Sequence, residues 1–315
     1  MITKLLMIGC GDIAIRLAND LIQDLSITKN SENKKTLELY GLRRHIDQLP
    51  KTIQGIACDL NTIDDLKECL GDGERSFDYV VITLVPNERS DEGYRQAYVA
   101  NIEKIITGLE ALDSPPKWVF LVSSTSVYGQ QAEQWVDEDS HTEPTHYSGQ
   151  RVLQGEQRLV QSTIPSTVIR FSGIYGPGRL RIIQQVENGD WEPEGSDEKL
   201  NNGYSNRIHA DDCAGVLAHF MRKAIKNEPL DNCYLASDCE PVRLNEVKQW
   251  IANRLGITNT KKVDEMPLTN NTNTKMRRNS KKCSNKKLLA SGYHFKYPTF
   301  REGYGQVIEH LKSTK

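Results

Sequence analysis

The first residues that could do chemistry are two glycines near the start of the chain, in the stretch LLMIGCGDIA at residues 5–14. They follow a short apolar run and stand at the spacing G-x-G-x-x-A. Gly9 permits a tight turn, and Gly11 lets the backbone approach a diphosphate. The free N–H groups at the start of the next helix, near Asp12 and Ile13, favour a bound anion. The pattern predicts a dinucleotide site, and the alternative is an ordinary glycine turn.

Two arginines, Arg43 and Arg44, end the second predicted strand. A carboxylate at this place would bond the ribose hydroxyls of adenosine and indicate NAD. Guanidinium groups instead offer paired donors to a 2′-phosphate. We therefore expect NADP as the cofactor, with NAD as the second choice. The alternative for the arginines themselves is a solvated basic turn.

Further candidate contacts follow the third and fourth predicted strands. Asp59 and Leu60 would lie beside the adenine, although Asp59 could instead cap the following helix. Thr83 lies at the carboxyl end of the fourth strand, the edge at which such sheets bind ligands. Asn101 falls within an apolar helical stripe, where a buried amide needs partners, such as a water or a strand bulge beside the site.

Hydroxyl groups gather after the fifth predicted strand, in the run SSTS at residues 123–126. Nineteen residues beyond Tyr128, Tyr147 opens a predicted helix, and Arg151 stands four positions later on the same face. A tyrosine, a fixed cation and a serine at one sheet edge could move a proton to or from a substrate oxygen.

The elements that must position these residues alternate between strand and helix along the chain. The predicted strands are 5–8, 36–42, 55–58, 78–84, 118–122, 166–171 and 233–236, and the predicted helices are 13–25, 61–70, 92–112, 147–161, 213–226 and 244–255. This alternation is typical of an α/β fold with a doubly wound parallel sheet. We expect a nucleotide-binding domain at 1–178, with returning segments at 206–237, and a small C-terminal substrate lobe at 179–205 and 238–315.

Composition limits the classes of function. The chain has 315 residues and a net charge of −2, so no overall attraction to nucleic acid or membrane follows. No apolar run approaches the ~20 residues of a membrane helix, and the start has no signal-peptide layout. The seven cysteines are scattered without a C-x-x-C pair, which predicts reduced thiols in a cytoplasmic protein rather than disulfides or zinc.

Two charged clusters have simple interpretations. His209 with Asp211 and Asp212 matches no standard ligand spacing, so we expect an aspartate N-cap and no metal. A basic cluster ends the polar stretch 258–280, which is predicted to be a mobile loop. It is either a solvated face or a contact for an anionic substrate or the 2′-phosphate. Its members are Lys275, Arg277, Arg278, Lys281, Lys282, Lys286 and Lys287.

Taken together, the motifs resemble the extended short-chain dehydrogenase/reductase superfamily, in its NAD-dependent epimerase/dehydratase group. They are G-x-G-x-x-A at 9–14, SSTSVYG at 123–129, Y-x-x-x-R at 147–151, RFSGIYGPGR at 170–179 and NRIHADD at 206–212. The segment 284–304 resembles an atypical bacterial branch, the YeeZ-like proteins. The resemblance implies a Rossmann fold and a nicotinamide dinucleotide that Tyr175 and Pro177 also contact.

In that superfamily a Ser or Thr, a Tyr and a Lys carry the reaction. By position, Ser124 would bond the reacting oxygen and Tyr147 would be the general acid/base. The lysine is replaced by Arg151, whose charge could supply most of the same electrostatic effect but whose planar head suits the ribose contact less well. Sugar-nucleotide epimerases usually carry an arginine where this chain has Ser205, which weakens the case for a nucleotide-sugar substrate; Arg179, Arg181 and Arg207 are the remaining candidate anion contacts.

Two hypotheses therefore remain open. The first is an NADP-dependent oxidoreductase, epimerase or dehydratase that acts on a small hydroxylated or carbonyl compound. The second is a catalytically degenerate NADP-binding sensor or interaction protein. In both cases we expect a monomer or a homodimer, with no nucleic-acid or membrane partner.

Overall fold

The computed structural model describes residues 2–27, 36–71, 76–130, 132–191, 203–258 and 281–313. These fall into two units. The first comprises Met1–Tyr128, Thr142–Phe171 and Cys213–Tyr234, and the second comprises Gly129–His141, Ser172–Asp212 and Leu235–Lys315. The predicted mobile loop lies outside the described residues from position 259 onward, as do Lys275, Arg277 and Arg278. Residues 129–141, 172–178, 206–212 and 235–237, which we expected in the nucleotide-binding domain, are assigned to the second unit.

A seven-stranded parallel sheet forms the centre of the first unit, in the order β11-β7-β5-β4-β1-β2-β3. The order reverses at β1, since β2 and β3 lie on one side of it and β4, β5, β7 and β11 on the other. This is the doubly wound topology that the sequence predicts. The strands are β1 Ile2–Ile8, β2 Thr36–Arg43, β3 Gln54–Ala57, β4 Tyr79–Ile82, β5 Trp118–Ser124, β7 Ser166–Phe171 and β11 Cys233–Ala236.

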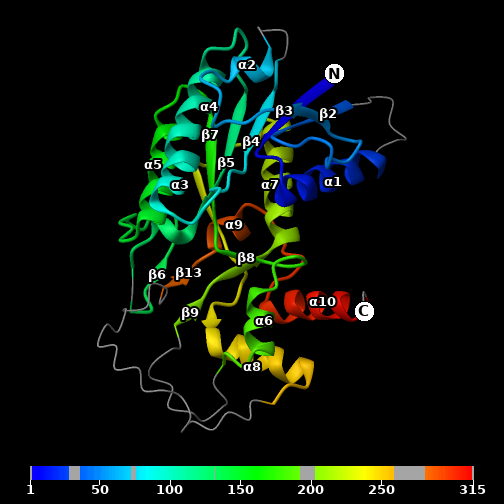
Figure 1. Cartoon of the computed structure of the whole chain (residues 1–315), viewed down its shortest axis with the longest axis vertical. Coiled ribbons are helices and arrows are strands. Elements are labelled where there is room, and N and C mark those ends of the chain that lie inside the picture. The colour runs from blue at the N-terminus through cyan, green and yellow to red at the C-terminus, as the bar shows by residue number, and fades with distance from the viewer. Residues whose placement is uncertain are drawn as a thin grey trace. The chain divides into compact units, whose positions relative to one another are not determined.

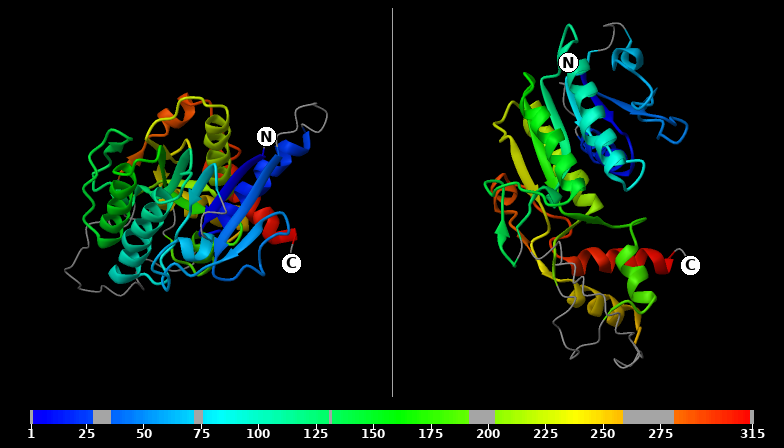
Figure 2. Two further views of the ribbon diagram at one scale, coloured as in Figure 1. Left: turned by 90° about the horizontal axis from the view of Figure 1, so that it is seen from above. Right: turned by 60° about the vertical axis from the view of Figure 1, so that its left-hand side comes forward.

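Helices cover both faces of this sheet (Figure 1; Figure 2). One face carries α1 Asp12–Ile27 and α7 Ala210–Ile225, and the other carries α3 Asp91–Arg95, α4 Asn101–Glu110 and α5 Tyr147–Val160. Because both faces are covered, the central strands are apolar without alternation: all four residues of β4 and the last four of β1 are buried. The side chains on one face of these strands, Leu6, Ile8, Val80 and Ile82, belong to one core cluster with Ile102, Ile105 and Leu109 of α4.

The predicted helix at 61–70 is shorter than expected, since only α2, Lys67–Leu70, is helical. Carboxylates in this segment bond nearby backbone N–H groups instead, as when Glu68 accepts from the N–H groups of residues 64 and 65. Such local bonds compete with a helical ladder. The Lys104 ammonium also donates to the carbonyl groups of Leu60, at 2.8 Å, and of Ile63, so the segment is tied to α4.

The predicted helix at 92–112 is present but interrupted. A π-helical turn, η1 Gln96–Ala100, separates α3 from α4. Gly155 of α5 fits against this turn, because a Cβ atom there would lie 2.5 Å from the carbonyl oxygen of Tyr98. Helix α5 and the π-helical turn therefore pack more closely than any side chain larger than hydrogen at position 155 would allow.

Cys58 and Cys69 form a disulfide, with their Cα atoms 5.8 Å apart. The prediction that all seven cysteines are reduced thiols is wrong for this pair. The sequence gives little warning, because the bond depends on the irregular segment between β3 and α2 folding back on itself. The free cysteines are Cys10, Cys213, Cys233, Cys239 and Cys283.

In its described residues, the second unit contains short strand pairs and four helices. Strand β8 Gly173–Tyr175 pairs with β10 Arg207–His209, β9 Tyr204–Ser205 with β12 Val242–Arg243, and β6 Trp135–Val136 with β13 Lys282–Cys283. The helices are α6 Arg181–Glu187, α8 Leu244–Leu255, α9 Lys286–Ala290 and α10 Phe300–Ser313. Side chains from β8, α6, α8 and α10 form its apolar core.

The described part of the basic cluster is not simply a solvated face. Lys281 is buried, and the Lys282 ammonium lies over the rings of Trp135 and Tyr204, 5.2 Å from each centroid. Within the described ranges, none of the helices combines the length and apolar character needed to cross a bilayer.

Candidate functional site

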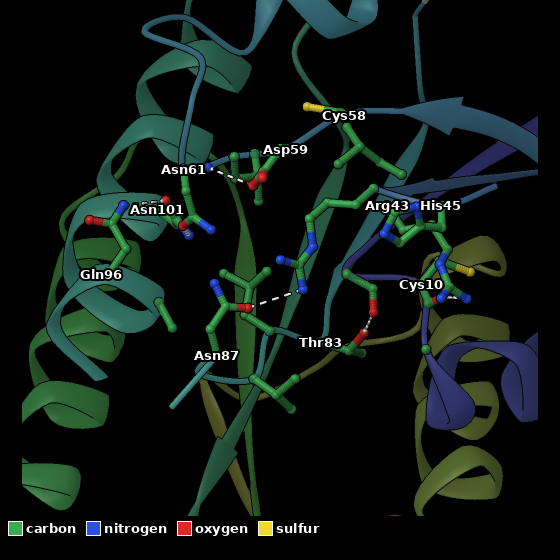
Figure 3. Close-up of a pocket in the computed structure, with 18 of the residues that line it drawn as sticks. Cys10, Arg43, His45, Cys58, Asp59, Asn61, Thr83, Asn87, Gln96 and Asn101 are labelled. Atoms are coloured by element: carbon green, nitrogen blue, oxygen red, sulfur yellow. Dashed lines mark hydrogen bonds between the residues drawn. The ribbon is translucent and has the colours of Figure 1, made fainter. Parts of the chain in front are cut away.

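A pocket of about 250 Å³ opens in the first unit at the carboxyl ends of β1, β2, β3 and β4 (Figure 3). This is the sheet edge at which the sequence predicts a ligand. The lining residues are Gly9, Cys10, Gly11, Leu42, Arg43, Arg44, His45, Cys58, Asp59, Leu60, Asn61, Thr83, Leu84, Val85, Asn87, Gly93, Gln96, Ala97 and Asn101.

The glycine turn forms the part of the pocket wall next to β1. Gly9 has φ +77°, and a Cβ atom there would lie 2.9 Å from the carbonyl oxygen of Thr83. The Thr83 hydroxyl donates to the carbonyl of Gly9 at 2.8 Å, which fixes the turn to the end of β4. A Cβ atom on Gly11 would meet only the Gly9 oxygen, at 3.7 Å, so this face of the turn is open. Only glycine suits position 9, and position 11 leaves room for a ligand.

Helix α1 begins directly after this turn. Asp12 is its first residue and pairs with Arg16 at 2.8 Å, while the Ile13 side chain is buried. Neither Asp12 nor Ile13 is among the residues that line the pocket. A contact from the backbone N–H groups of these two residues therefore stays a prediction.

Three basic side chains line the pocket at the end of β2. Arg43 donates to the carbonyl of Cys10 and to the Gln48 amide oxygen, at 3.3 Å each. Arg44 donates to the Asn87 amide oxygen at 3.1 Å. His45 joins them, although no motif in the sequence predicts this; its place beside the two arginines is the only signal. The group gives this end of the pocket a positive charge.

The polar side chains of the opposite wall are uncharged apart from Asp59. Asp59 accepts a hydrogen bond from the backbone N–H of Asn61 at 3.1 Å and caps no helix, because α2 begins only at Lys67. The Asn101 amide, 6 % exposed, donates to Asn61 at 3.1 Å and accepts from Gln96 at 3.0 Å. Asn101 thus has the partners that its burial requires, and they are side chains rather than a bulge.

The thiol of Cys10 forms part of the pocket floor. Burial raises the pKa of Cys10 to about 11, although the nearby Arg43 charge acts in the opposite direction. The group is therefore a neutral thiol at neutral pH and not a nucleophile.

The predicted catalytic residues lie outside this pocket. Ser124, at the end of β5, accepts a hydrogen bond from the N–H of Ser126 at 3.1 Å and so caps the short 3₁₀ turn η2 Thr125–Val127. Tyr147 starts α5, and its hydroxyl donates to the carbonyl of Arg89 at 2.8 Å. Arg151 binds both carboxylate oxygens of Asp91, at 2.8 and 3.1 Å. None of the three is hydrogen-bonded to another.

A buried ionic network lies behind the serine run. Glu156 of α5 and Arg170 of β7 are 3 % and 9 % exposed and share three hydrogen bonds. Ser123 donates to Glu156, and Arg170 donates to the Tyr128 hydroxyl at 2.9 Å. The network joins β5, β7 and α5, and two of its members, Ser123 and Tyr128, lie on either side of Ser124 in the sequence.

Tyr175 and Pro177 belong to the second unit. The Tyr175 ring is 4 % exposed and stacks on Tyr304 at 4.4 Å, with its hydroxyl against Gly303. Burial raises the pKa of Tyr175. The side chain thus has a clear structural role in this core, and a contact of Tyr175 or Pro177 with a cofactor stays a prediction.

The turn before α7 differs from the expected aspartate cap. The His209 ring accepts from the N–H of Asp211 at 3.2 Å, and Asp212 accepts instead from Tyr293, at 2.8 Å, and from the N–H of Lys296, at 2.7 Å. Arg207, a candidate anion contact, is buried and lies over the Phe300 ring. In the described part of the chain, no group of three or more His, Cys, Asp or Glu side chains could hold a metal ion.

No protein-family model matches the sequence, and no curated protein is similar to it. Solved structures are similar over nearly the whole length. A protein from Methylobacillus flagellatus described as an NAD-dependent epimerase/dehydratase has a TM-score of 0.75 at 29 % identity, with 98 % of each chain covered. UDP-glucuronic acid 4-epimerase from Bacillus cereus, in complex with NAD, has 0.70 at 18 %, with 99 % of each covered. The human epimerase family protein SDR39U1, with NADPH, has 0.70 at 16 %, with 98 % and 99 % covered.

Proposed function

We infer from its structural neighbours, which are NAD-dependent epimerase/dehydratase proteins, that this chain is an extended short-chain dehydrogenase/reductase, as its motifs suggest. We propose that the chain binds NADP(H) in the pocket and uses this cofactor on a small hydroxylated or carbonyl compound. The neighbours support a nicotinamide dinucleotide in general, since one is in complex with NAD and another with NADPH. The narrower YeeZ-like resemblance is not confirmed.

The observation that carries this proposal is the glycine turn. Gly9 is held in the left-handed region by its fit against Thr83, and the open face of Gly11 borders the pocket at the start of α1. Backbone N–H groups at a helix N-terminus bind a diphosphate without any charged side chain. The pocket then extends from this turn between the basic group on one side and Asp59 and Asn61 on the other.

The choice of NADP over NAD rests on the end of β2. Arg43 and Arg44 line the pocket there, where a carboxylate would serve the ribose hydroxyls of NAD. Both guanidinium groups have only neutral partners among the hydrogen bonds given above, so neither charge is neutralised by an ion pair there. A 2′-phosphate would supply the missing negative charge.

The experiment is a pair of binding titrations, with NADPH and NADH, followed by nicotinamide fluorescence. Replacing Arg44 by Ala should weaken NADPH binding by about ten- to hundredfold, since charge-assisted hydrogen bonds are worth ~1.5–3 kcal/mol, and should change NADH binding little. Arg254→Ala is the matched control, because Arg254 pairs with Glu309 in the second unit. Equal or tighter binding of NADH by the unaltered protein would contradict the NADP assignment.

For the chemical step we propose Ser124 and Tyr147 as the groups that face the substrate oxygen. The bound dinucleotide supplies or accepts a hydride at carbon. Tyr147 would pass the proton to or from the oxygen, and Ser124 would donate a hydrogen bond to it. Tyr147→Phe should then abolish turnover on a panel of carbonyl compounds while leaving NADPH binding within about twofold. Retained turnover would remove Tyr147 from the reaction. Binding with no turnover by the unaltered protein on any compound would instead support the sensor alternative.

A further inference from the structure

One short segment, residues 89–91 at the start of α3, binds both of the functional positions on α5. The carbonyl of Arg89 accepts the hydroxyl proton of Tyr147 at 2.8 Å. Asp91 binds Arg151 through two parallel hydrogen bonds, Nε to Oδ1 at 2.8 Å and Nη2 to Oδ2 at 3.1 Å. The acid/base candidate and its cation are therefore bound by neighbouring residues of the same segment.

The guanidinium of Arg151 is fully engaged in this arrangement. Its third nitrogen, Nη1, donates to the Gln154 amide oxygen at 3.1 Å, one turn further along α5. A planar fork that meets a carboxylate in two places is fixed in orientation as well as position. A lysine ammonium has no such fork and could not reproduce this pairing. The arginine at position 151 and the aspartate at position 91 thus form one matched unit.

Asp91 is well placed to keep its negative charge. It is the first residue of α3, whose N-terminus is capped by Ser90 and favours anions. The hydrogen bonds from Arg151 hold the pKa of Asp91 below its usual range. The side chains of Arg151 and Asp91 are nevertheless 26 % and 52 % exposed. An ion pair this open to water is weak, so a ligand with its own acceptor groups can compete for the arginine.

We propose that Asp91 is a positioning residue that competes with the bound dinucleotide for Arg151. The inference rests on the proposed function, together with the contact to the cofactor ribose that the family resemblance implies for position 151. Asp91 sets where the guanidinium lies, and the dinucleotide must draw Arg151 away from Asp91 to gain its donors. Removing the charge of Asp91 should release Arg151 and make cofactor binding tighter.

The test compares Asp91→Asn with Glu92→Gln. Both remove one carboxylate charge from the first turn of α3, but Glu92 pairs with Arg95 and not with Arg151. In NADPH titrations we expect Asp91→Asn to lower Kd by about two- to fivefold and Glu92→Gln to leave it unchanged. The effect must act through the arginine, so in an Arg151→Met background Asp91→Asn should leave Kd unchanged. A merely structural role for Asp91 would not produce this dependence.

The outcomes separate the two proposals. If the unaltered protein binds neither NADPH nor NADH, the proposed function fails and the inference fails with it. If it binds NADPH but Asp91→Asn binds with the same or a higher Kd, the competition is refuted and the proposed function stands. A tightening that persists in the Arg151→Met background also refutes it. Should Asp91→Asn unfold, Asp91→Ser serves as the second variant under the same criteria.

Discussion

The buried pair of Glu156 and Arg170 gives the sharpest test of how the serine run is supported. Replacing Arg170 by Met keeps an apolar stem of similar length but removes the guanidinium. Glu156 would then keep Ser123 as its hydrogen-bond donor in the network and would lose its counter-charge. The Tyr128 hydroxyl would lose the donor that lies 2.9 Å away.

The expected loss follows from burial. With both partners under 10 % exposed, removal of one leaves an uncompensated charge, and this costs about 3–5 kcal/mol of unfolding free energy. For a unit of ~150–250 residues, each kcal/mol lowers the melting temperature by about 2–4 °C. We expect Arg170→Met to lower the melting temperature by roughly 6–20 °C, measured by circular dichroism and by urea titration.

Arg158→Met is the matched control. Arg158 also pairs with two carboxylates, Glu103 at 2.7 Å and Glu110 at 3.1 Å, but 22 % of its side chain is exposed. Exposed pairs contribute ~0.2–1 kcal/mol each, so this variant should lose no more than about 2 kcal/mol. Adding Glu156→Gln to Arg170→Met should restore part of the stability, because it removes the stranded charge. Equal losses in the two arginine variants, or no recovery in the double variant, would refute the reasoning.

Three further outcomes follow from other parts of the chain. Gly155→Ala should lower the melting temperature by several degrees, because its Cβ atom would meet a carbonyl oxygen at 2.5 Å, whereas Gly305→Ala should be tolerated, since the nearest atom is 4.0 Å away; similar losses would contradict the close packing. Thiol titration of the unfolded, unreduced protein should find five free thiols rather than seven, because Cys58 and Cys69 are bonded, and seven would contradict the disulfide. Burial raises the pKa of Asp238 from 3.8 to about 7. The folded state therefore keeps a proton that the unfolded state has lost between about pH 4 and 7, and stability should fall across this window as pH rises, by up to roughly 4 kcal/mol. Asp238→Asn should flatten the profile in urea titrations, and an unchanged slope would exclude Asp238 as its source.

Elements whose sequence pattern is set by burial were predictable. The sixth predicted strand, 166–171, and the predicted helix 244–255 match β7 and α8 residue for residue. A strand covered on both faces is rich in apolar residues, here Val168, Ile169 and Phe171, and a helix on a core shows a periodic apolar stripe, so both can be recognised in the sequence. The glycine turn was equally predictable, because only glycine fits the backbone at position 9.

Features that depend on distant partners were not predictable in the same way. The bonds of Tyr147 and Arg151 to residues 89 and 91 join positions about sixty apart, and no local pattern reports them. The helix expected at 61–70 is shorter for a related reason: the Lys104 ammonium, from a distant part of the chain, donates to the carbonyl groups of Leu60 and Ile63, and helix propensity cannot reveal this partner. His45 lines the pocket because of where β2 ends rather than because of any motif.

The π-helical turn Gln96–Ala100 decides which side chains can meet at the pocket wall. In a regular α-helix, residues five apart point about 140° away from each other, since each step turns the chain by ~100°. Gln96 and Asn101 are five apart and yet hydrogen-bonded at 3.0 Å, because the wider turn brings them back into line. The extra residue of the π turn thus lets Gln96 reach Asn101 across a spacing of five; regular α-helical winding at the same spacing would turn the glutamine away and leave the buried amide of Asn101 without this donor.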